Sequence, residues 1–359
     1  MTIKVSKPAI NIREELADLK QDTGLKGQEL MRANTAEEVR TAISAGRKNM
    51  IINGGFDVAQ RGTTGTCSTD NYGQYLSVDR WSLYYNGSTV AQTEVNIPDG
   101  TNSLVKAAKV TVSSTTDERP WFSQRIEHGS KLLNNKTVSL SFWGRGNTTL
   151  DAKFRFRFQD NATAAANVVN GWSVTDDGYE FTLTSEWIKY EWTGVLVDTS
   201  VNNTRVLDLV ADAPSATWSS GDWMEITQVQ LEVGSVATEF EHRSYGEELL
   251  LCQRYYQYGS TSSTYCGFSN GSSQVYFTVP LTTPLRASPT LTRSGSGTRT
   301  WTACKHNGNN NSTADPSVVT YVAGAFDIAC RQTGHSGLSD MYATNLYAST
   351  YYIIFDAEL

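Results

Sequence analysis

From Asn49 onward, apolar and polar residues alternate along short stretches of the chain. The stretches 138–143, 154–158 and 187–192 either alternate or are rich in aromatic residues, and such patterns are typical of strands with one buried face. Clusters of Gly, Asn and Asp separate these stretches, and no helical pattern lies between them. This pattern therefore predicts that residues 49–243 form an antiparallel β-sandwich of the jelly-roll type.

The last part of the chain repeats the strand pattern with more polar sequence between the strands. We expect strands at 275–279, 317–322 and 351–355, and a loop over 298–316, which is rich in Asn, Gly and Thr. Residues 247–359 are accordingly interpreted as a second β-sandwich domain.

A leucine-rich segment, 246–256, leads into this second domain. It reads Gly-Glu-Glu-Leu-Leu-Leu-Cys-Gln-Arg-Tyr-Tyr. Its leucines are compatible either with one or two helical turns or with a direct lead into the next strand. The sequence leaves both alternatives open.

The first 48 residues differ from the rest because they are charged and contain no aromatic residue. Asn11 with Glu14, and Thr35 with Glu38, have the spacing of a helix N-cap and its returning carboxylate. Helices this short are marginal alone in water, so a second copy or a larger assembly should cover their apolar face, unless the segment is a free tail. The residues assigned to this attachment are Ile12, Leu16, Leu19, Val39 and Ile43.

At 359 residues the chain is too long for one ordinary core. We expect a mainly β fold in which a short N-terminal helical attachment segment (1–48) precedes two antiparallel, jelly-roll-like β-sandwich domains (49–243 and 247–359).

The composition excludes several classes of function. The formal net charge is -7, so no general basic field attracts nucleic acid. No apolar stretch approaches the roughly 18 to 20 residues that span a bilayer, and the start MTIKVSKPAI lacks the apolar core of a secretory signal. We expect a soluble protein made in a cytosol, with no nucleic-acid partner and no membrane insertion.

Cysteine and histidine do not form metal-binding or nucleophilic patterns. The 5 cysteines have no CxxC spacing, and the 4 histidines are not paired at ligand spacing. Buried free thiols are therefore expected, together with no metal and no cofactor.

Residues 261–359 carry unusually few charges. They contain the basic residues Arg286, Arg293, Arg299, Lys305 and Arg331, and the acidic residues Asp315, Asp327, Asp340, Asp356 and Glu358. So sparse a charge favours a module that packs against copies of itself.

Three stretches resemble a pattern that recurs in fibre and other virion proteins of tailed bacteriophages. The first is Arg47-Lys-Asn-Met-Ile-Ile-Asn-Gly-Gly-Phe56, followed by Gln60-Arg-Gly-Thr63 and Asp79-Arg-Trp81. The others are Gln230-Leu-Glu-Val-Gly-Ser-Val-Ala-Thr-Glu-Phe-Glu-His-Arg243 and Glu248-Leu-Leu-Leu-Cys-Gln-Arg-Tyr-Tyr256. The start of the chain and its end, Phe355-Asp-Ala-Glu-Leu359, look like the ends of the same proteins.

This resemblance implies a homotrimeric tail fibre subunit of a virion, assembled in the bacterial host cytoplasm. Residues 1–48 would bind a tail adaptor, a baseplate or a capsid protein, and the β domains would bind a host cell-surface polysaccharide. The alternatives are a capsid-attached head fibre or decoration protein without a receptor-binding role, and an accessory module of a soluble glycosidase.

The domain 49–243 is also similar to the jelly-roll carbohydrate-binding modules attached to many glycosidases. Sugar binding needs flat aromatic faces beside planar hydrogen-bonding groups. Trp81, Tyr84, Tyr85, Trp121 and Trp218 are possible sources, but Trp81, Leu83 and Tyr85 share one face of a strand and are expected in the core. The candidate ligand-binding residues are Trp172, Tyr265, Trp301 and His306, the last three with subunit packing as the alternative.

Hydrolysis of a polysaccharide would require two carboxylates across a sugar-binding groove. Asp176, Asp177, Asp212 and Asp222 qualify by residue type alone, and Asp176-Asp177-Gly178 is better explained as a hairpin turn. The sequence lacks the long repeats of β-helical tailspikes. We therefore expect no catalytic residues and no enzyme activity.

Overall fold

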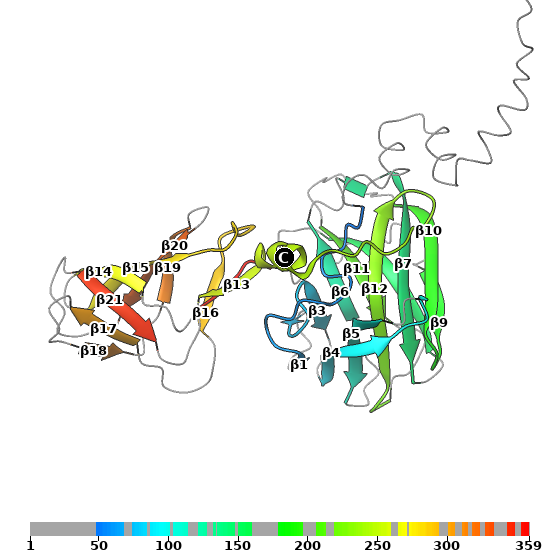
Figure 1. Cartoon of the computed structure of the whole chain (residues 1–359), viewed down its shortest axis with the longest axis horizontal. Helices are drawn as coiled ribbons and strands as arrows, with labels where there is room; N and C mark the ends of the chain where they lie inside the picture. Colours follow the sequence, from blue (N-terminus) through cyan, green and yellow to red (C-terminus); the bar gives the residue numbers. More distant parts are fainter. Residues whose placement is uncertain are drawn as a thin grey trace, which may run out of the picture.

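The computed structural model describes two β-rich parts joined by one short helix (Figure 1). The described residues are 48–67, 74–84, 87–100, 103–113, 121–127, 132–133, 135–147, 150–159, 179–196, 206–212, 219–259, 265–270, 273–293, 301–305, 311–314, 318–323, 327–333, 343–348 and 353–358. The residues assigned to attachment lie outside them, so the N-terminal helical anchor remains a prediction.

The first part is a sandwich of two antiparallel sheets. Sheet A has 6 strands in the order β1 (Thr64–Thr66), β4 (Ser88–Asn96), β5 (Leu104–Val112), β12 (Trp223–Val233), β7 (Lys136–Gly146) and β10 (Ile188–Leu196). Sheet B has 6 strands in the order β2 (Gln74–Tyr75), β3 (Trp81–Tyr84), β6 (Trp121–Ile126), β11 (Val206–Asp212), β8 (Leu150–Gln159) and β9 (Tyr179–Leu183).

The chain crosses repeatedly between these sheets. From β5 to β8, and again from β9 to β12, each strand lies in the sheet opposite to the one before it. Alternating apolar residues on both inner faces can then interdigitate, which is how a sandwich buries its core. The mainly β, antiparallel fold predicted from the alternation is confirmed.

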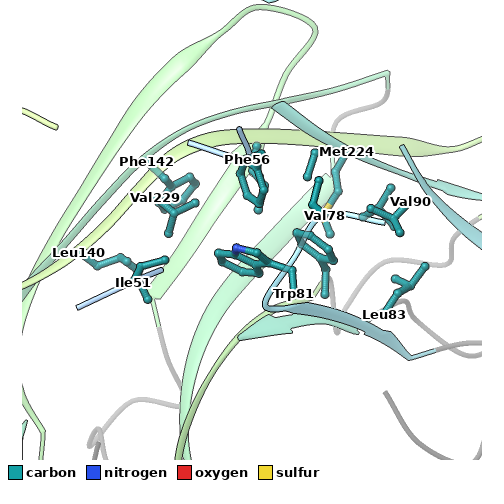
Figure 2. Packing of buried hydrophobic residues seen from close by; sticks show 14 of the residues in the cluster. Ile51, Phe56, Val78, Trp81, Leu83, Val90, Leu140, Phe142, Met224 and Val229 are labelled. Carbon is teal, nitrogen blue, oxygen red and sulfur yellow. The ribbon is translucent and has the colours of Figure 1, made fainter. Parts of the chain in front are cut away.

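The core of the sandwich is built around Trp81 (Figure 2). The Trp81 ring stacks on Phe122 with ring centres 4.9 Å apart and lies 5.2 Å from Phe56. Its indole N–H donates to the carbonyl oxygen of Asn53 at 3.2 Å, so the buried polar atom is satisfied. The expectation that Trp81 and Leu83 are core residues is confirmed, and Tyr85, expected on the same face, lies outside the described residues.

Strand β12 changes face midway. Met224 and Ile226 point into the core, and after a bulge between Thr227 and Gln230 the inward residues are Val229 and Leu231. Gln228, with φ of 50°, absorbs the extra residue. Before the bulge, Glu225 and Thr227 therefore face away from the sandwich core.

The segment that opens the domain is held by two asparagines. Asn49 accepts from the backbone N–H groups of Ile51 and Leu231, and Asn53 donates to the carbonyl oxygens of Val58 and Asp79. These bonds tie the first described residues to sheet A and to the start of β3.

The second part contains two further sheets. Sheet C has 3 strands, in the order β13 (Tyr256–Gly259), β22 (Ile353–Asp356) and β16 (Thr290–Arg293). Sheet D has 7 strands, in the order β18 (Asn311–Ala314), β17 (Trp301–Lys305), β21 (Ala343–Ala348), β14 (Tyr265–Asn270), β15 (Gln274–Pro280), β20 (Asp327–Thr333) and β19 (Val318–Ala323).

The two sheets share one core. Ile353 and Phe355 of sheet C pack with Phe277 and Ile328 of sheet D. The strands expected at 275–279, 317–322 and 351–355 correspond to β15, β19 and β22.

The loop predicted over 298–316 is wrong, because this stretch contains β17 and β18. β17 pairs with β21 on one side and with β18 on the other. Backbone pairing with a neighbouring strand outweighs the weak strand preference of the Asn-, Gly- and Thr-rich sequence.

Of the two alternatives that the sequence left open for the leucine-rich segment, the structure confirms the helical one. It forms α5 (Tyr245–Gln253) and then leads into β13. Ser244 and Glu247 form a complete capping box at the start of the helix. No helix in the described part of the chain has the length and apolar character needed to cross a membrane.

Candidate functional site

The outer face of sheet A gathers aromatic and charged side chains. Lys109 on β5, Glu225 on β12, and Trp143 and Arg145 on β7 occupy the positions that alternate with the core residues of those strands. Trp187, just before β10, and Trp223, at the start of β12, lie beside them. We call these residues, with Thr93 of β4, the aromatic face.

An ion pair fixes the middle of the aromatic face. Arg145 donates from Nε to Glu225 Oε2 at 2.8 Å, and its Nη2 lies 2.7 Å from the same oxygen. Thr93 donates to the other carboxylate oxygen at 3.0 Å. Only 3% of the Glu225 side chain is exposed, against 30% for Arg145. The carboxylate is therefore buried and hydrogen-bonded, while the guanidinium keeps access to solvent.

Both cations of the aromatic face lie against indole rings. The Arg145 guanidinium carbon is 4.6 Å from the ring centre of Trp187 and 5.7 Å from that of Trp223. The Lys109 ammonium nitrogen is 4.2 Å from the ring centre of Trp223. Such cation–π contacts hold the rings in place, and each typically contributes about 0.5 to 2 kcal/mol of interaction free energy.

A small apolar cluster supports the same face. Val95, Ile97 and Ala107 are buried on this side of sheet A, and Trp143 and Trp187 pack against them. The tryptophans are half-buried, so each has both a packed and an accessible part. A rigid support of this kind keeps ring orientation fixed before any ligand arrives.

One carboxylate near this face has a structural role. Asp222 accepts from the backbone N–H of Ser219 at 2.7 Å and from the side-chain amide of Asn147 at 3.4 Å. It closes the turn before β12 and is 8% exposed. Of the four aspartates that qualified by residue type, Asp222 is thus a turn residue, and the side chains of the other three lie outside the described residues.

A second cluster lies where the sandwich meets α5, β13 and the end of the chain. The guanidinium carbon of Arg80 is 3.5 Å from the ring centre of Tyr255, and that of Arg61 is 3.7 Å from the ring centre of Tyr256. We call these residues, with Asp79 and Glu358, the junction.

Glu358 bridges both arginines of the junction. Its Oε1 lies 3.3 Å from Arg61 Nη2, and its Oε2 accepts from Arg80 Nη1. Arg80 is 1% exposed and Glu358 4% exposed. Burial alone would lower the pKa of Arg80, but the Glu358 carboxylate raises it above its ordinary value. Arg80 therefore stays charged, and its charge is balanced by the penultimate residue of the chain.

Asp79 is the most strongly perturbed carboxyl group of the junction. Burial raises its pKa to about 6, although Arg61 at 3.3 Å and the amide of Gln60 at 2.5 Å both act to lower it. Gln60 also donates to the backbone carbonyl of Tyr256 at 3.2 Å. Gln60, Arg61 and Arg80, which belong to the stretches Gln60-Arg-Gly-Thr63 and Asp79-Arg-Trp81, thus contact the segment after α5.

Two further carboxylates hold α5 and the residues after it. Burial acts to raise the pKa of Glu127, but hydrogen bonds from Arg254 and Tyr255, both at 3.0 Å, lower it. Glu248 accepts from the backbone N–H of Asn53 at 2.5 Å and pairs with Arg243 at 3.3 Å. Strongly perturbed groups often mark functional sites, but structural ion-pair networks produce the same shifts. Every partner here comes from the chain itself.

The residues predicted to bind ligand are only partly placed. Trp172 and His306 lie outside the described residues. Tyr265 and Trp301 begin β14 and β17, which flank β21, where they pair with Leu346 and Ala348. These two residues thus lie on opposite sides of β21, with partners two positions apart on it, while their side chains lie outside the described part.

The sequence interpretation missed the aromatic face. Trp143 and Trp187 were assigned to strands without a role, and Trp223 was not singled out. The sequence does contain a usable signal. Trp143 and Arg145 are two positions apart on one strand, and Trp223 and Glu225 are two positions apart on another, so each pair lies on one face. A charged residue on the same face as a tryptophan indicates that this face points outward.

The structure describes the side chains of three of the cysteines. Cys67, Cys252 and Cys330 are buried thiols outside any disulfide, as expected, and burial raises the pKa of the Cys330 thiol to about 12. Within the described residues no three His, Cys, Asp or Glu side chains are grouped as metal ligands.

Comparison with known proteins gives structural matches only. No family model matches the sequence, and no curated protein matches it. The carbohydrate-binding module CBM4 is 17% identical, with a TM-score of 0.31, over 51% of this chain and 98% of that chain. The CBM22-1 xylan-binding domain of Paenibacillus barcinonensis Xyn10C is 13% identical, with a TM-score of 0.30, over 48% and 94%. The enzymatically active domain of tailspike protein 4 of bacteriophage CBA120 is 17% identical, with a TM-score of 0.32, over 52% of this chain and 21% of that chain.

Proposed function

We propose that this chain is a structural subunit of a tailed-phage particle that binds carbohydrate through the aromatic face of its first sandwich. The observation that carries the binding role is the arrangement of three half-buried indoles around the Arg145–Glu225 pair. Sugars present apolar C–H faces ringed by hydroxyl groups, so they are bound by flat aromatic rings beside fixed polar groups. The aromatic face supplies both on a rigid sheet.

The virion role is supported by the phage-like signature in the sequence. We propose a homotrimeric tail fibre subunit, assembled in the bacterial host cytoplasm, that is attached to the particle by residues 1–48. Several identical sites on one fibre would raise avidity for a repetitive host polysaccharide without a tight single site. The proposed role is binding, without a catalytic step or a cofactor.

The binding role is tested with the purified full-length chain and polysaccharide from host cells. Trp187→Ala and Trp223→Ala are each expected to weaken binding about tenfold, since an aromatic contact contributes about 0.5 to 1.5 kcal/mol beyond its buried area. Tyr258→Ala is the matched control, because this exposed tyrosine lies on β13 of sheet C. Unchanged affinity in both tryptophan variants, with intact folding by circular dichroism, would exclude the aromatic face.

The virion role needs a separate test. Deletion of residues 1–48 is expected to abolish incorporation into particles while the β domains stay folded. Electron microscopy of particles labelled with an antibody to the C-terminal domain would locate the subunit. Label around the head would replace the tail fibre with a head fibre or decoration protein, and incorporation of the truncated chain would exclude the attachment role.

A further inference from the structure

Resting on the proposed function, we propose further that the aromatic face selects acidic carbohydrate and binds the carboxylate of a uronic acid at Lys109, beside Trp223. The inference comes from the charges of the face rather than from its rings.

These charges form a row across three neighbouring strands. Glu225 on β12 pairs in register with Lys109 on β5 and with Arg145 on β7, so one carboxylate lies between two cations. That carboxylate is already used, because Arg145 and Thr93 both hydrogen-bond to it. It is also 97% shielded from solvent, its side chain being 3% exposed. The row therefore presents an excess of one positive charge to the solvent.

Lys109 carries this excess. Although Glu225 is its neighbour across the strands, its ammonium group lies over the Trp223 ring at 4.2 Å. Among the described carboxylates, none lies within ion-pairing distance of Lys109. Two other lysines of sheet A differ in this respect: Lys106 pairs with Glu94 at 2.5 Å, and Lys189 pairs with Glu191 at 2.7 Å.

A uronic acid fits this pair of groups by its chemistry. Its ring has an apolar face of C–H groups that can stack on an indole, and its carboxylate projects from the edge of the same ring. Lys109 can engage both features of one sugar residue when its ammonium group moves from the face of the Trp223 ring to the ring edge and the sugar takes its place on the face. A hydrogen bond from the ammonium group to a carboxylate joins two opposite charges, so it is stronger than a hydrogen bond from the same ammonium group to a neutral hydroxymethyl group.

The test compares each acidic polymer with its own neutral form. Fragments of polygalacturonate, alginate and hyaluronan, and the same fragments after chemical reduction of their carboxyl groups, are titrated into the full-length chain by calorimetry at low and high salt. At least one acidic fragment is expected to bind about tenfold more tightly than its reduced form, which is the usual worth of a hydrogen bond between charged groups. The preference should shrink at high salt.

Substitutions locate the effect. Lys109→Gln is expected to remove the acidic preference and to leave affinity for the reduced fragment unchanged, whereas Lys109→Arg retains the preference. Lys106→Gln and Lys189→Gln are matched controls that should bind as the unmodified chain does. Equal binding of acidic and reduced fragments, or a Lys109→Gln variant that keeps the preference, overturns the acidic selection and leaves carbohydrate binding standing. Failure of every acidic and neutral fragment, together with host polysaccharide, overturns both proposals.

Discussion

The guanidinium group of Arg80 lies over the phenol ring of Tyr255, with 3.5 Å between the guanidinium carbon and the ring centre. Arg80 directly precedes β3, the strand that carries the central tryptophan of the first sandwich, and Tyr255 lies shortly after α5. On its edge, the same guanidinium is bound by Glu358 and donates to the carbonyl oxygen of Arg125 at 2.7 Å. One buried cation thus connects three segments that are far apart in the sequence.

Glu358→Gln is expected to lower the free energy of unfolding by about 3 to 5 kcal/mol, because it leaves the buried Arg80 without its carboxylate, whereas Arg61 keeps Asp79 and Asp356. Denaturation by urea, followed by tryptophan fluorescence, measures the change. Glu239→Gln is the control, since Glu239 is exposed. A loss below about 1 kcal/mol would show that the fold does not depend on the negative charge of Glu358.

Arg80→Lys keeps the charge but removes the planar group that stacks on Tyr255 and reaches Arg125. We expect a loss of about 1 to 3 kcal/mol, since lysine cannot reproduce a stacked, forked donor. Arg254→Lys, at a position that is 43% exposed, should lose less than about 1 kcal/mol. Equal losses in the two variants would contradict a special role for the buried stack.

Asp79 should make stability depend on pH between about 4 and 7. Its pKa is about 6 in the folded chain, against an ordinary value of 3.8. Because the folded-state pKa is raised, the contribution of Asp79 to stability is fully present below pH 3.8 and is lost as the pH rises through 6. The shift of about 2 pKa units corresponds to at most about 3 kcal/mol.

Comparison with Asp79→Asn isolates this effect, because other carboxyl groups titrate in the same range. The pKa of Glu127 is lowered, so that group contributes in the opposite direction, with stability lost as the pH falls. As the pH rises from 4 to 7, the unfolding free energy of the unmodified chain should therefore fall relative to that of the variant. A difference that stays constant with pH would mean that the Asp79 pKa is not raised.

Gly54→Ala is expected to destabilise the first sandwich by about 3 kcal/mol or more, because the new Cβ atom would lie 2.1 Å from the carbonyl oxygen of Val229. Gly246→Ala is the matched control. Gly246 lies in the first turn of α5, and a Cβ atom added there would meet nothing within 4 Å. Alanine should therefore stabilise the helix by about 0.5 to 1 kcal/mol. Thermal unfolding of both variants gives the comparison.

Much of the first sandwich could be predicted because alternation is a local property. The pattern at 138–143 identifies β7, and the adjacency of Trp81 and Leu83 on one face follows from strand geometry. Strands β17 and β18 could not be found in this way, since they lie in a stretch rich in Asn, Gly and Thr, and pairing of β17 with β21 and of β18 with β17 determines their structure.

The two sites were hidden for different reasons. The junction residues were all visible in the phage-like signature, but Arg80 and Glu358 are separated by 278 positions, and no local pattern relates them. The aromatic face depends on which side of each strand points outward and on which strands lie side by side. Glu225 lies opposite Lys109 of β5 and Arg145 of β7, and no local pattern relates these three strands.

The pairing of β13 with β22 has a consequence for how such a chain can change over evolution. Tyr256 lies opposite Asp356, so the polypeptide leaves the first sandwich and returns to it at one place (Figure 1). The segment between β13 and β22 therefore begins and ends at the junction. Recombination could replace this segment by one from another protein that has the same first and last strands, and the junction would be preserved. Sheet D can then diverge in sequence while the contacts of the junction with the first sandwich stay constant.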